Sequence, residues 1–176
     1  MPAPLGRRQL LARSGAAGLF AVCGQWLWLT PSEAKTRGFE PQILTRDQCN
    51  ALSTLGDALV PGASDAGIAA YIDLQLQAGE DSLLIGKYLG VDTSAQTDFY
   101  RAAADNVITL TDGNSSMPSF IADMAADSLS EWVGPPASYM LFVLRADALD
   151  VTYGTPGGFE NLGIPYMAHI MPEQSW

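Results

Sequence analysis

Residues 44–62, LTRDQCNALSTLGDALVPG, decide the fold of this chain. Thr45 and Gln48 have the spacing of a capping box, in which the threonine hydroxyl accepts from the third helical amide and the glutamine reaches back. Leucines follow at the helical spacing of positions 52, 55 and 59, and Val60-Pro61-Gly62 ends the run. The stretch therefore predicts an amphipathic helix that must bury one face against other helices.

Four further segments carry the same kind of apolar stripe. We expect a helix beginning at Ser64-Asp65, a longer one over about 94–111, one beginning at Pro118, and one over 139–153 that is central because its first half is apolar nearly all round. No segment alternates like a strand, and no repeat is visible. The sequence predicts an all-α fold, a single small bundle of about five helices with an irregular Gly/Pro-rich C-terminal tail.

The first thirty-four residues have the pattern of an export leader. Arg7-Arg8-Gln9-Leu10-Leu11 precedes an uncharged stretch, residues 14–29, which is too short for a comfortable membrane span of about 20 residues. Ser32-Glu33-Ala34 is a plausible cleavage site. The paired arginines favour the twin-arginine route, which accepts folded proteins, over a general secretory signal. An uncleaved anchor and a lipid anchor on Cys23 remain as alternatives.

We therefore predict a signal peptide over residues 1–34 and a helical domain over residues 35–176, which is long enough for one core. That domain has 6 basic and 18 acidic residues, a net charge of −12. Because such a surface repels phosphate backbones, the composition argues against nucleic acid as a partner. Cys49 is its single cysteine, for which we expect a buried thiol and no disulfide.

The sequence offers no pattern that catalysis would need. Haem-attachment, nucleotide-binding, phosphate-loop, zinc-protease and nucleophile-elbow motifs are missing, and the single His169 cannot supply a multi-imidazole metal site. Carboxylates at Asp123, Asp127, Glu131, Asp147 and Asp150 are expected on solvated faces, and Asp112-Gly113-Asn114 is expected to be a plain turn rather than a calcium loop. We predict no catalytic, cofactor-binding or metal-binding residue in this chain.

The C-terminal tail contains large apolar residues that a disordered tail would lack. It must pack on something, either its own bundle or another protein, and the sequence leaves both open. The candidate residues for a subunit interface are Tyr153, Phe159, Ile164, Pro165, Tyr166, His169, Ile170 and Trp176.

Two stretches resemble the small (gamma) subunit family of gluconate 2-dehydrogenase, also called subunit 3. The first is Leu44-Thr45-x-x-Gln48, then Leu52-x-x-Leu55-x-Asp57-x-Leu59-Val60-Pro61-Gly62, then Ala66-Gly67-Ile68-x-x-Tyr71-Ile72-Asp73. The second is Tyr153-Gly154 followed by Gly163-Ile164-Pro165-Tyr166. The resemblance extends over essentially all of residues 35–176, with a specific motif only in the first stretch.

The resemblance implies a non-catalytic subunit of a periplasmic, membrane-associated complex that oxidises a sugar, a sugar acid or a polyol. A large subunit would hold FAD, a multihaem cytochrome c subunit would accept electrons through haem c, and this chain would bind no cofactor. Arg7 and Arg8 would engage the twin-arginine translocase and export the folded flavoprotein with this chain, which then stabilises it. The alternatives are a self-contained periplasmic enzyme and a free-standing periplasmic binding module.

Overall fold

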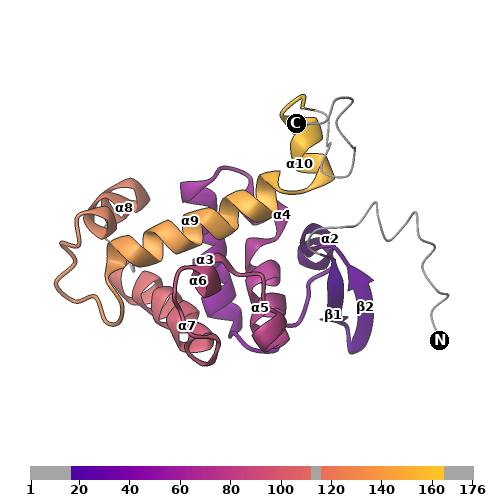
Figure 1. The fold of residues 1–176 in the computed structure, drawn as a ribbon, viewed down its shortest axis with the longest axis horizontal. Helices are drawn as coiled ribbons and strands as arrows, with labels where there is room; N and C mark the ends of the chain where they lie inside the picture. Colours follow the sequence, from indigo (N-terminus) through magenta and orange to yellow (C-terminus); the bar gives the residue numbers. More distant parts are fainter. Residues whose placement is uncertain (1–16, 112–115, 165–176) are drawn as a thin grey trace, which may run out of the picture.

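The computed structural model describes residues 17–111 and 116–164. Within these residues the chain is mostly helical, with a two-stranded sheet near its N-terminal end (Figure 1). In order, the elements are β1 (Gly18–Val22), β2 (Gln25–Leu29), α2 (Pro31–Thr36), α3 (Arg46–Leu59), α4 (Ala63–Ala66), α5 (Ile68–Ala78), the short 3₁₀ helix η1 (Gly79–Asp81), α6 (Ile85–Tyr88), α7 (Thr93–Leu110), α8 (Met117–Ala125), α9 (Ala137–Tyr153) and α10 (Pro156–Asn161). The predicted small helical bundle is confirmed.

Helices α3, α5, α7 and α9 form the core of the bundle. Helix α3 packs against the other three, and its Leu52 and Leu55 are completely buried. Helix α9 crosses the front of the bundle in Figure 1. It buries one row of apolar side chains, Met140, Val143, Leu144, Ala148 and Val151.

The start of α3 is held as the sequence predicts. The backbone N–H of Gln48 donates to the hydroxyl of Thr45 at 3.2 Å, and the backbone N–H of Thr45 donates to the side-chain oxygen of Gln48 at 3.0 Å. Two amides that a helix leaves without partners are thereby satisfied. The predicted capping box is confirmed.

The helix predicted from Ser64-Asp65 is divided in two by Gly67. This glycine has φ +85°, so it ends α4 and begins α5 in the left-handed region. A Cβ atom at Gly67 would lie 2.3 Å from the carbonyl oxygen of Pro31. The position therefore requires glycine both for its backbone conformation and for the close approach of α2.

The helix predicted from Pro118 is shorter than expected and ends at Ala125. Asp127, at φ 50°, turns the chain, and its carboxylate accepts from the backbone N–H of Ser138 at 2.8 Å and from the Ser138 hydroxyl at 2.6 Å. A negative charge at this place stabilises the N-terminus of α9. Asp123, Asp127 and Glu131 are all exposed, as predicted, but only Asp123 lies in α8.

The expectation of no strand is wrong for residues 18–29. They form an antiparallel hairpin in which Leu19 pairs with Trp28 and Val22 with Gln25. The two-residue turn, Cys23-Gly24, has positive φ at both positions, which suits the right-handed twist of the strands. Both faces of the hairpin are apolar, so the sequence shows no polar–apolar alternation.

A buried carboxylate fixes the segment between the hairpin region and α3. Asp73, on α5, accepts from the backbone N–H groups of Gln42, Ile43 and Leu44 at 2.8–2.9 Å. It also accepts from the side-chain amide of Gln77 at 3.1 Å. The side chain of Asp73 therefore ties the end of the extended segment between α2 and α3 to α5.

Among the residues that the structure describes, no helix has the length and apolar character that a membrane crossing requires.

Candidate functional site

Residues 17–111 and 116–164 contain no group of three or more histidine, cysteine, aspartate or glutamate side chains that could hold a metal ion. Cys49 is buried against the core, and its burial raises the pKa of the thiol to about 12. The prediction of a buried, unpaired cysteine is confirmed.

One open depression of about 570 Å³ lies along α7. Its lining includes Arg101, Asp105 and Glu131. Arg101 donates to the backbone carbonyl of Ile43 at 2.6 Å, and Asp105 accepts from the side chain of Gln48 at 2.9 Å. These two charged groups therefore already join α7 to α3 and to the segment before it.

A second open depression, of about 530 Å³, lies between the hairpin and the end of α5. Leu19, Trp26, Leu74 and Leu83 contribute to its lining, which is more apolar than polar. An apolar side chain would fit this surface better than a charged substrate.

A polar cluster in the interior is centred on Asp147 of α9. Its carboxylate accepts a short hydrogen bond from the hydroxyl of Tyr100 on α7 and a second, of 3.0 Å, from the backbone N–H of Ile85 at the start of α6. Asp147 is almost completely buried. Burial, reinforced by the charge of Asp150, raises the pKa of Asp147 to about 6, although the two hydrogen bonds oppose the shift.

Two tyrosines complete this buried polar cluster. The Tyr71 hydroxyl on α5 donates to Asp150 at 3.4 Å. Burial is the main cause that raises the pKa of both Tyr71 and Tyr100 above the ordinary tyrosine value, and nearby carboxylates add to it. Both phenols therefore stay protonated at neutral pH and act as hydrogen-bond donors.

We interpret this cluster as a structural one, which holds α9 against the bundle, and call it the clamp. Neither depression described above is lined by Tyr71, Tyr100, Asp147 or Asp150. The hydrogen bonds join α9 to α5, α6 and α7, so they fix the position of α9. The prediction that Asp147 lies on a solvated face is wrong, because it falls on the buried row of α9; Asp150 is exposed, as predicted.

The opposite side of α9 is an uncovered apolar stripe. Phe142 is 58% exposed and Leu149 is 41% exposed. Ala146 lies between them and Tyr153 follows one turn later, both half-buried. The spacing of 142, 146, 149 and 153 places all four on one helix face. We call these four residues the outer stripe.

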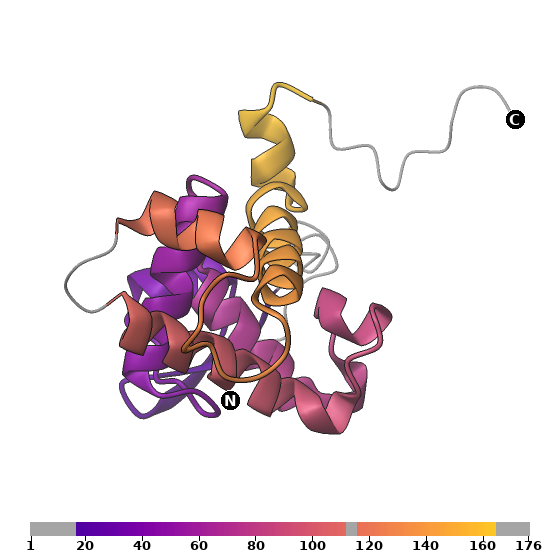
Figure 2. The ribbon, with the colours of Figure 1, turned by 90° about the vertical axis from the view of Figure 1, so that its left-hand side faces the viewer.

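The outer stripe leads into α10, which stands away from the bundle at the end of α9 (Figure 2). The tail is thus partly ordered into a helix that packs on α9. Its N-terminus is capped by Thr155, whose hydroxyl accepts from the backbone N–H of Gly158 at 3.1 Å. Leu162 and Ile164, after α10, are each 51% exposed.

The predicted interface residues that the structure describes all lie on this arm. Tyr153 ends α9, Phe159 lies in α10 and is half-buried, and Ile164 is exposed. The other five, Pro165, Tyr166, His169, Ile170 and Trp176, lie outside the described residues, as do Arg7, Arg8 and Asp112-Gly113-Asn114. The sequence gives no signal for the exposure of Phe142, because it lies in the helix half that is apolar nearly all round. Leu149 lies in the amphipathic second half, on the face opposite Leu144 and Val151.

The residues that carry the family resemblance have structural roles in this chain. Asp57 accepts from the backbone N–H groups of Gly62 and Ser64, both at 3.1 Å, and so holds the turn into α4. The lack of a side chain at Gly67 allows α2 to pack closely there, and Asp73 holds the segment before α3. The motif therefore describes how α3, α4 and α5 are joined.

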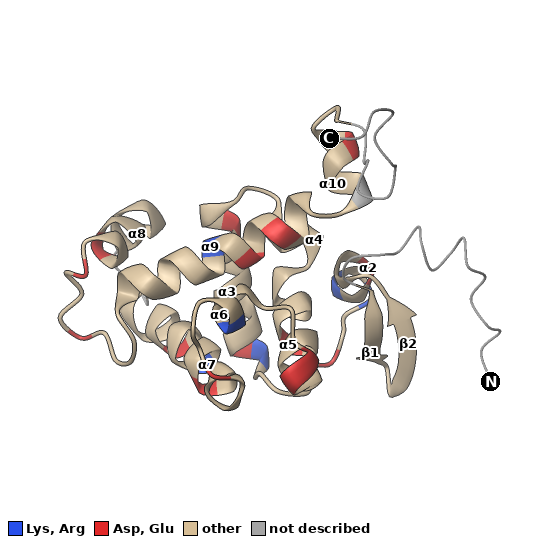
Figure 3. Ribbon diagram, viewed as in Figure 1, with Lys and Arg blue, Asp and Glu red and all other residues tan. Residues whose placement is uncertain are grey.

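Acidic residues are spread over the described elements and outnumber basic ones (Figure 3), and exposed acidic side chains occur on α7, on α9 and in the segment just after α5. No family model, curated protein or solved structure gives a significant match to the chain. The resemblance to the gluconate 2-dehydrogenase small subunit therefore stays a prediction.

Proposed function

We propose that this chain is a non-catalytic small subunit of a periplasmic, membrane-associated dehydrogenase complex that oxidises a sugar, a sugar acid or a polyol. The large subunit holds FAD, and a cytochrome c subunit with haem c is a further candidate partner. This chain binds the flavoprotein, takes it through the twin-arginine translocase and then stabilises it.

The observation that carries the proposal is the apolar arm formed by α9 and α10. Phe142, Leu149, Leu162 and Ile164 are exposed along it, and exposed apolar patches of this kind mark protein-binding surfaces. The buried clamp around Asp147 holds α9 rigidly behind the outer stripe. A preorganised helix face loses little conformational entropy when a partner covers it.

The leader supplies the second half of the proposal. A flavoprotein must fold in the cytoplasm to acquire FAD, so it needs an export route that passes folded proteins. Arg7 and Arg8 give this chain the pattern of such a route. A flavoprotein without its own leader would then cross the membrane only when bound to this chain.

The export role is tested by co-expressing the chain with a glucose–methanol–choline-type flavoprotein that has no leader of its own. We expect Arg7→Lys together with Arg8→Lys to abolish dehydrogenase activity in the periplasm and leave it in the cytoplasm. Arg13→Lys is the matched control, because it keeps the arginine pair. Unchanged periplasmic activity in the double variant would show that the escort role is wrong.

The binding surface is tested separately by Phe142→Ser together with Leu149→Ser. We expect this variant to lose co-elution with the flavoprotein while remaining folded, because both side chains are already exposed. Leu83→Ser together with Val133→Ser is the control, since these residues are also exposed but belong to neither α9 nor α10. Equal loss of binding in both double variants would reject the assignment of the outer stripe.

A further inference from the structure

The predicted cleavage site lies inside a folded helix. Ala34 is 0% exposed and belongs to α2. The helix is fixed by a capping box in which the backbone N–H of Glu33 donates to the Thr30 hydroxyl at 3.2 Å and the backbone N–H of Thr30 donates to Glu33 at 2.9 Å. Proteolysis concentrates at exposed, unpaired chain, so cleavage between Ala34 and Lys35 requires α2 to unfold.

Helix α2 is attached to the bundle on both sides of that bond. The ammonium group of Lys35 contacts the carboxylate of Asp65 at 2.6 Å, and the Ser32 hydroxyl donates to the Asp65 carbonyl at 2.8 Å. The carbonyl of Pro31 occupies the space that a side chain at Gly67 would need. Release of α2 would therefore open the junction between α4 and α5.

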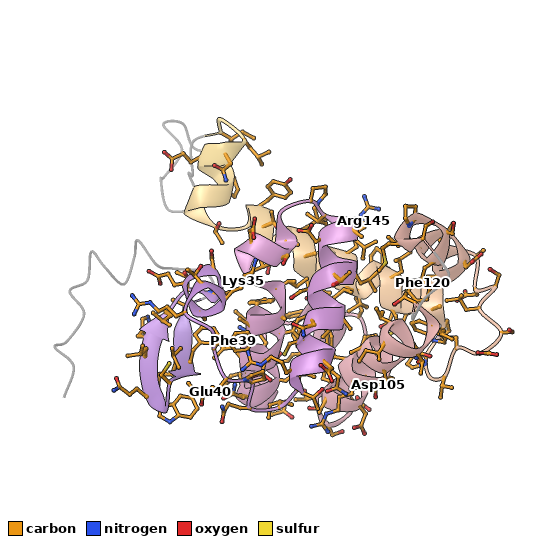
Figure 4. The ribbon with its side chains drawn as sticks, turned by 180° about the vertical axis from the view of Figure 1, so that it is seen from behind. Lys35, Phe39, Glu40, Asp105, Phe120 and Arg145 are labelled. Atoms are coloured by element: carbon orange, nitrogen blue, oxygen red, sulfur yellow. The ribbon has the colours of Figure 1, made fainter. Side chains whose placement is uncertain are left out.

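The hairpin before α2 belongs to the same core. Phe20 is 3% exposed and meets Phe39 edge to face, with ring centroids 6.2 Å apart. Figure 4 shows Phe39 between the hairpin and the helices. The backbone N–H of Glu40 donates to the carbonyl of Ala21 at 2.7 Å, and a Cβ at Gly18 would lie 2.5 Å from Leu74. The hairpin, residues 18–29, thus covers α5 and the extended segment before α3.

We propose that residues 18–34 stay in the exported protein as a permanent layer of its fold, and that any leader processing cuts before Gly18. The inference rests on the proposed twin-arginine route, because that route passes chains that are already folded. A chain that folds before it is exported presents these residues to the leader peptidase already packed, with Ala34 buried and the Ala34–Lys35 bond inside a helix. The predicted signal peptide then has two parts, a detachable segment with Arg7 and Arg8 and a retained hairpin with α2.

The stability of the full chain tests whether the hairpin is part of the fold. Phe20 points into the core, whereas Leu19, next to it, is 49% exposed on the other face. We expect Phe20→Ala to lower the thermal midpoint by about 10 °C, and Leu19→Ala to change it by no more than a degree or two. Equal midpoints for the two variants would overturn the proposal. Because the full chain is purified from the cytoplasm, this result does not depend on export or on a flavoprotein.

The intact mass of the protein recovered from the periplasm tests retention directly. A mass that includes Gly18 and the residues after it supports the proposal, and a mass that begins at Lys35 overturns it. If the Arg7→Lys, Arg8→Lys variant is exported like the unchanged chain, the proposed function fails, while the comparison of Phe20→Ala with Leu19→Ala still decides the role of the hairpin.

Discussion

The hydroxyl of Tyr100 donates a hydrogen bond to the carboxylate of Asp147 inside the bundle, across 47 positions of the sequence. The two residues join α7 to α9, and the backbone of Ile85 adds α6 to the same carboxylate. A polar group in such a place is tolerated only when its hydrogen bonds are satisfied. The position of α9, and with it the outer stripe, therefore depends on the protonation of one buried acid.

The stability of the bundle is expected to depend on pH through Asp147. Its folded-state pKa of about 6 lies above the ordinary value of 3.8, so the folded state binds the proton more tightly than the unfolded state. The stabilising contribution is complete below about pH 4 and is lost as the pH rises through 6. The free energy of unfolding of Asp147→Asn, relative to that of the unchanged chain, should therefore rise by about 2–3 kcal/mol between pH 4 and pH 7. Urea unfolding at several pH values measures the difference.

Asp98→Asn is the control for that series, because Asp98 is exposed on α7. Its difference in unfolding free energy from the unchanged chain should stay flat over the same range. A difference for Asp147→Asn that is equally flat would show that the buried acid does not titrate there.

Asp73→Ala is expected to be strongly destabilising. The carboxylate accepts from three consecutive backbone N–H groups, and alanine would leave these amides without their acceptor. Hydrogen bonds to charged groups contribute about 1.5–3 kcal/mol each, so a loss of about 3 kcal/mol or more is expected. Denaturant unfolding measures it. Asp81→Ala, at an exposed site, should cost less than about 0.5 kcal/mol; similar losses in both variants would contradict this role.

A comparison of two glycine substitutions is expected to measure the contact between α2 and α5. Gly67→Ala and Gly38→Ala both place alanine at positive φ, +85° and +69°. Only at Gly67 does the added Cβ meet a neighbour, the carbonyl of Pro31. Gly38→Ala should cost about 1–2 kcal/mol of unfolding free energy and Gly67→Ala clearly more. Equal costs in the full chain would show that α2 is not packed there.

The two thiols of the full chain are expected to react differently. Cys23 is exposed at the hairpin turn, whereas Cys49 is buried and its thiol has a pKa of about 12. Thiolate is the reactive form, so a thiol reagent at pH 8 should label one cysteine of the native protein rapidly and both after denaturation. Cys23→Ser should remove the rapid phase. Rapid labelling that persists in Cys23→Ser would mean that Cys49 is accessible.

The helices with clear signals were predictable from the sequence. Thr45 and Gln48 identify the start of α3 because a capping box is local, and α7 follows from a stripe that the structure reproduces within one residue at each end. Residues 18–29 were missed as strands, since a run that is apolar on both faces resembles the middle of a leader. Only the packing of Phe20 against Phe39, nineteen positions later, distinguishes the two.

The candidate site was less predictable, because it depends on which face of α9 is covered. Asp147 has the helical spacing of Met140, Leu144 and Val151, so the sequence pattern places it on the buried face of α9. Its charge led to the opposite prediction, a solvated position. Phe142 lies among equally apolar neighbours and gives no such signal. The arm beyond Tyr153 is recognisable as apolar, but the short helix α10 depends on the Thr155 cap and on the fit of Gly158 against Thr152.

The buried acid also makes folding a proton-uptake reaction in the mildly acidic range. Between the ordinary aspartate pKa of 3.8 and the folded-state pKa of about 6, Asp147 is protonated in the native chain and ionised in the unfolded chain. The contribution of Asp147 to the free energy of unfolding is therefore larger at pH 5 than at pH 7. Mild acidity would therefore stabilise the packing of α9, the helix that carries the outer stripe.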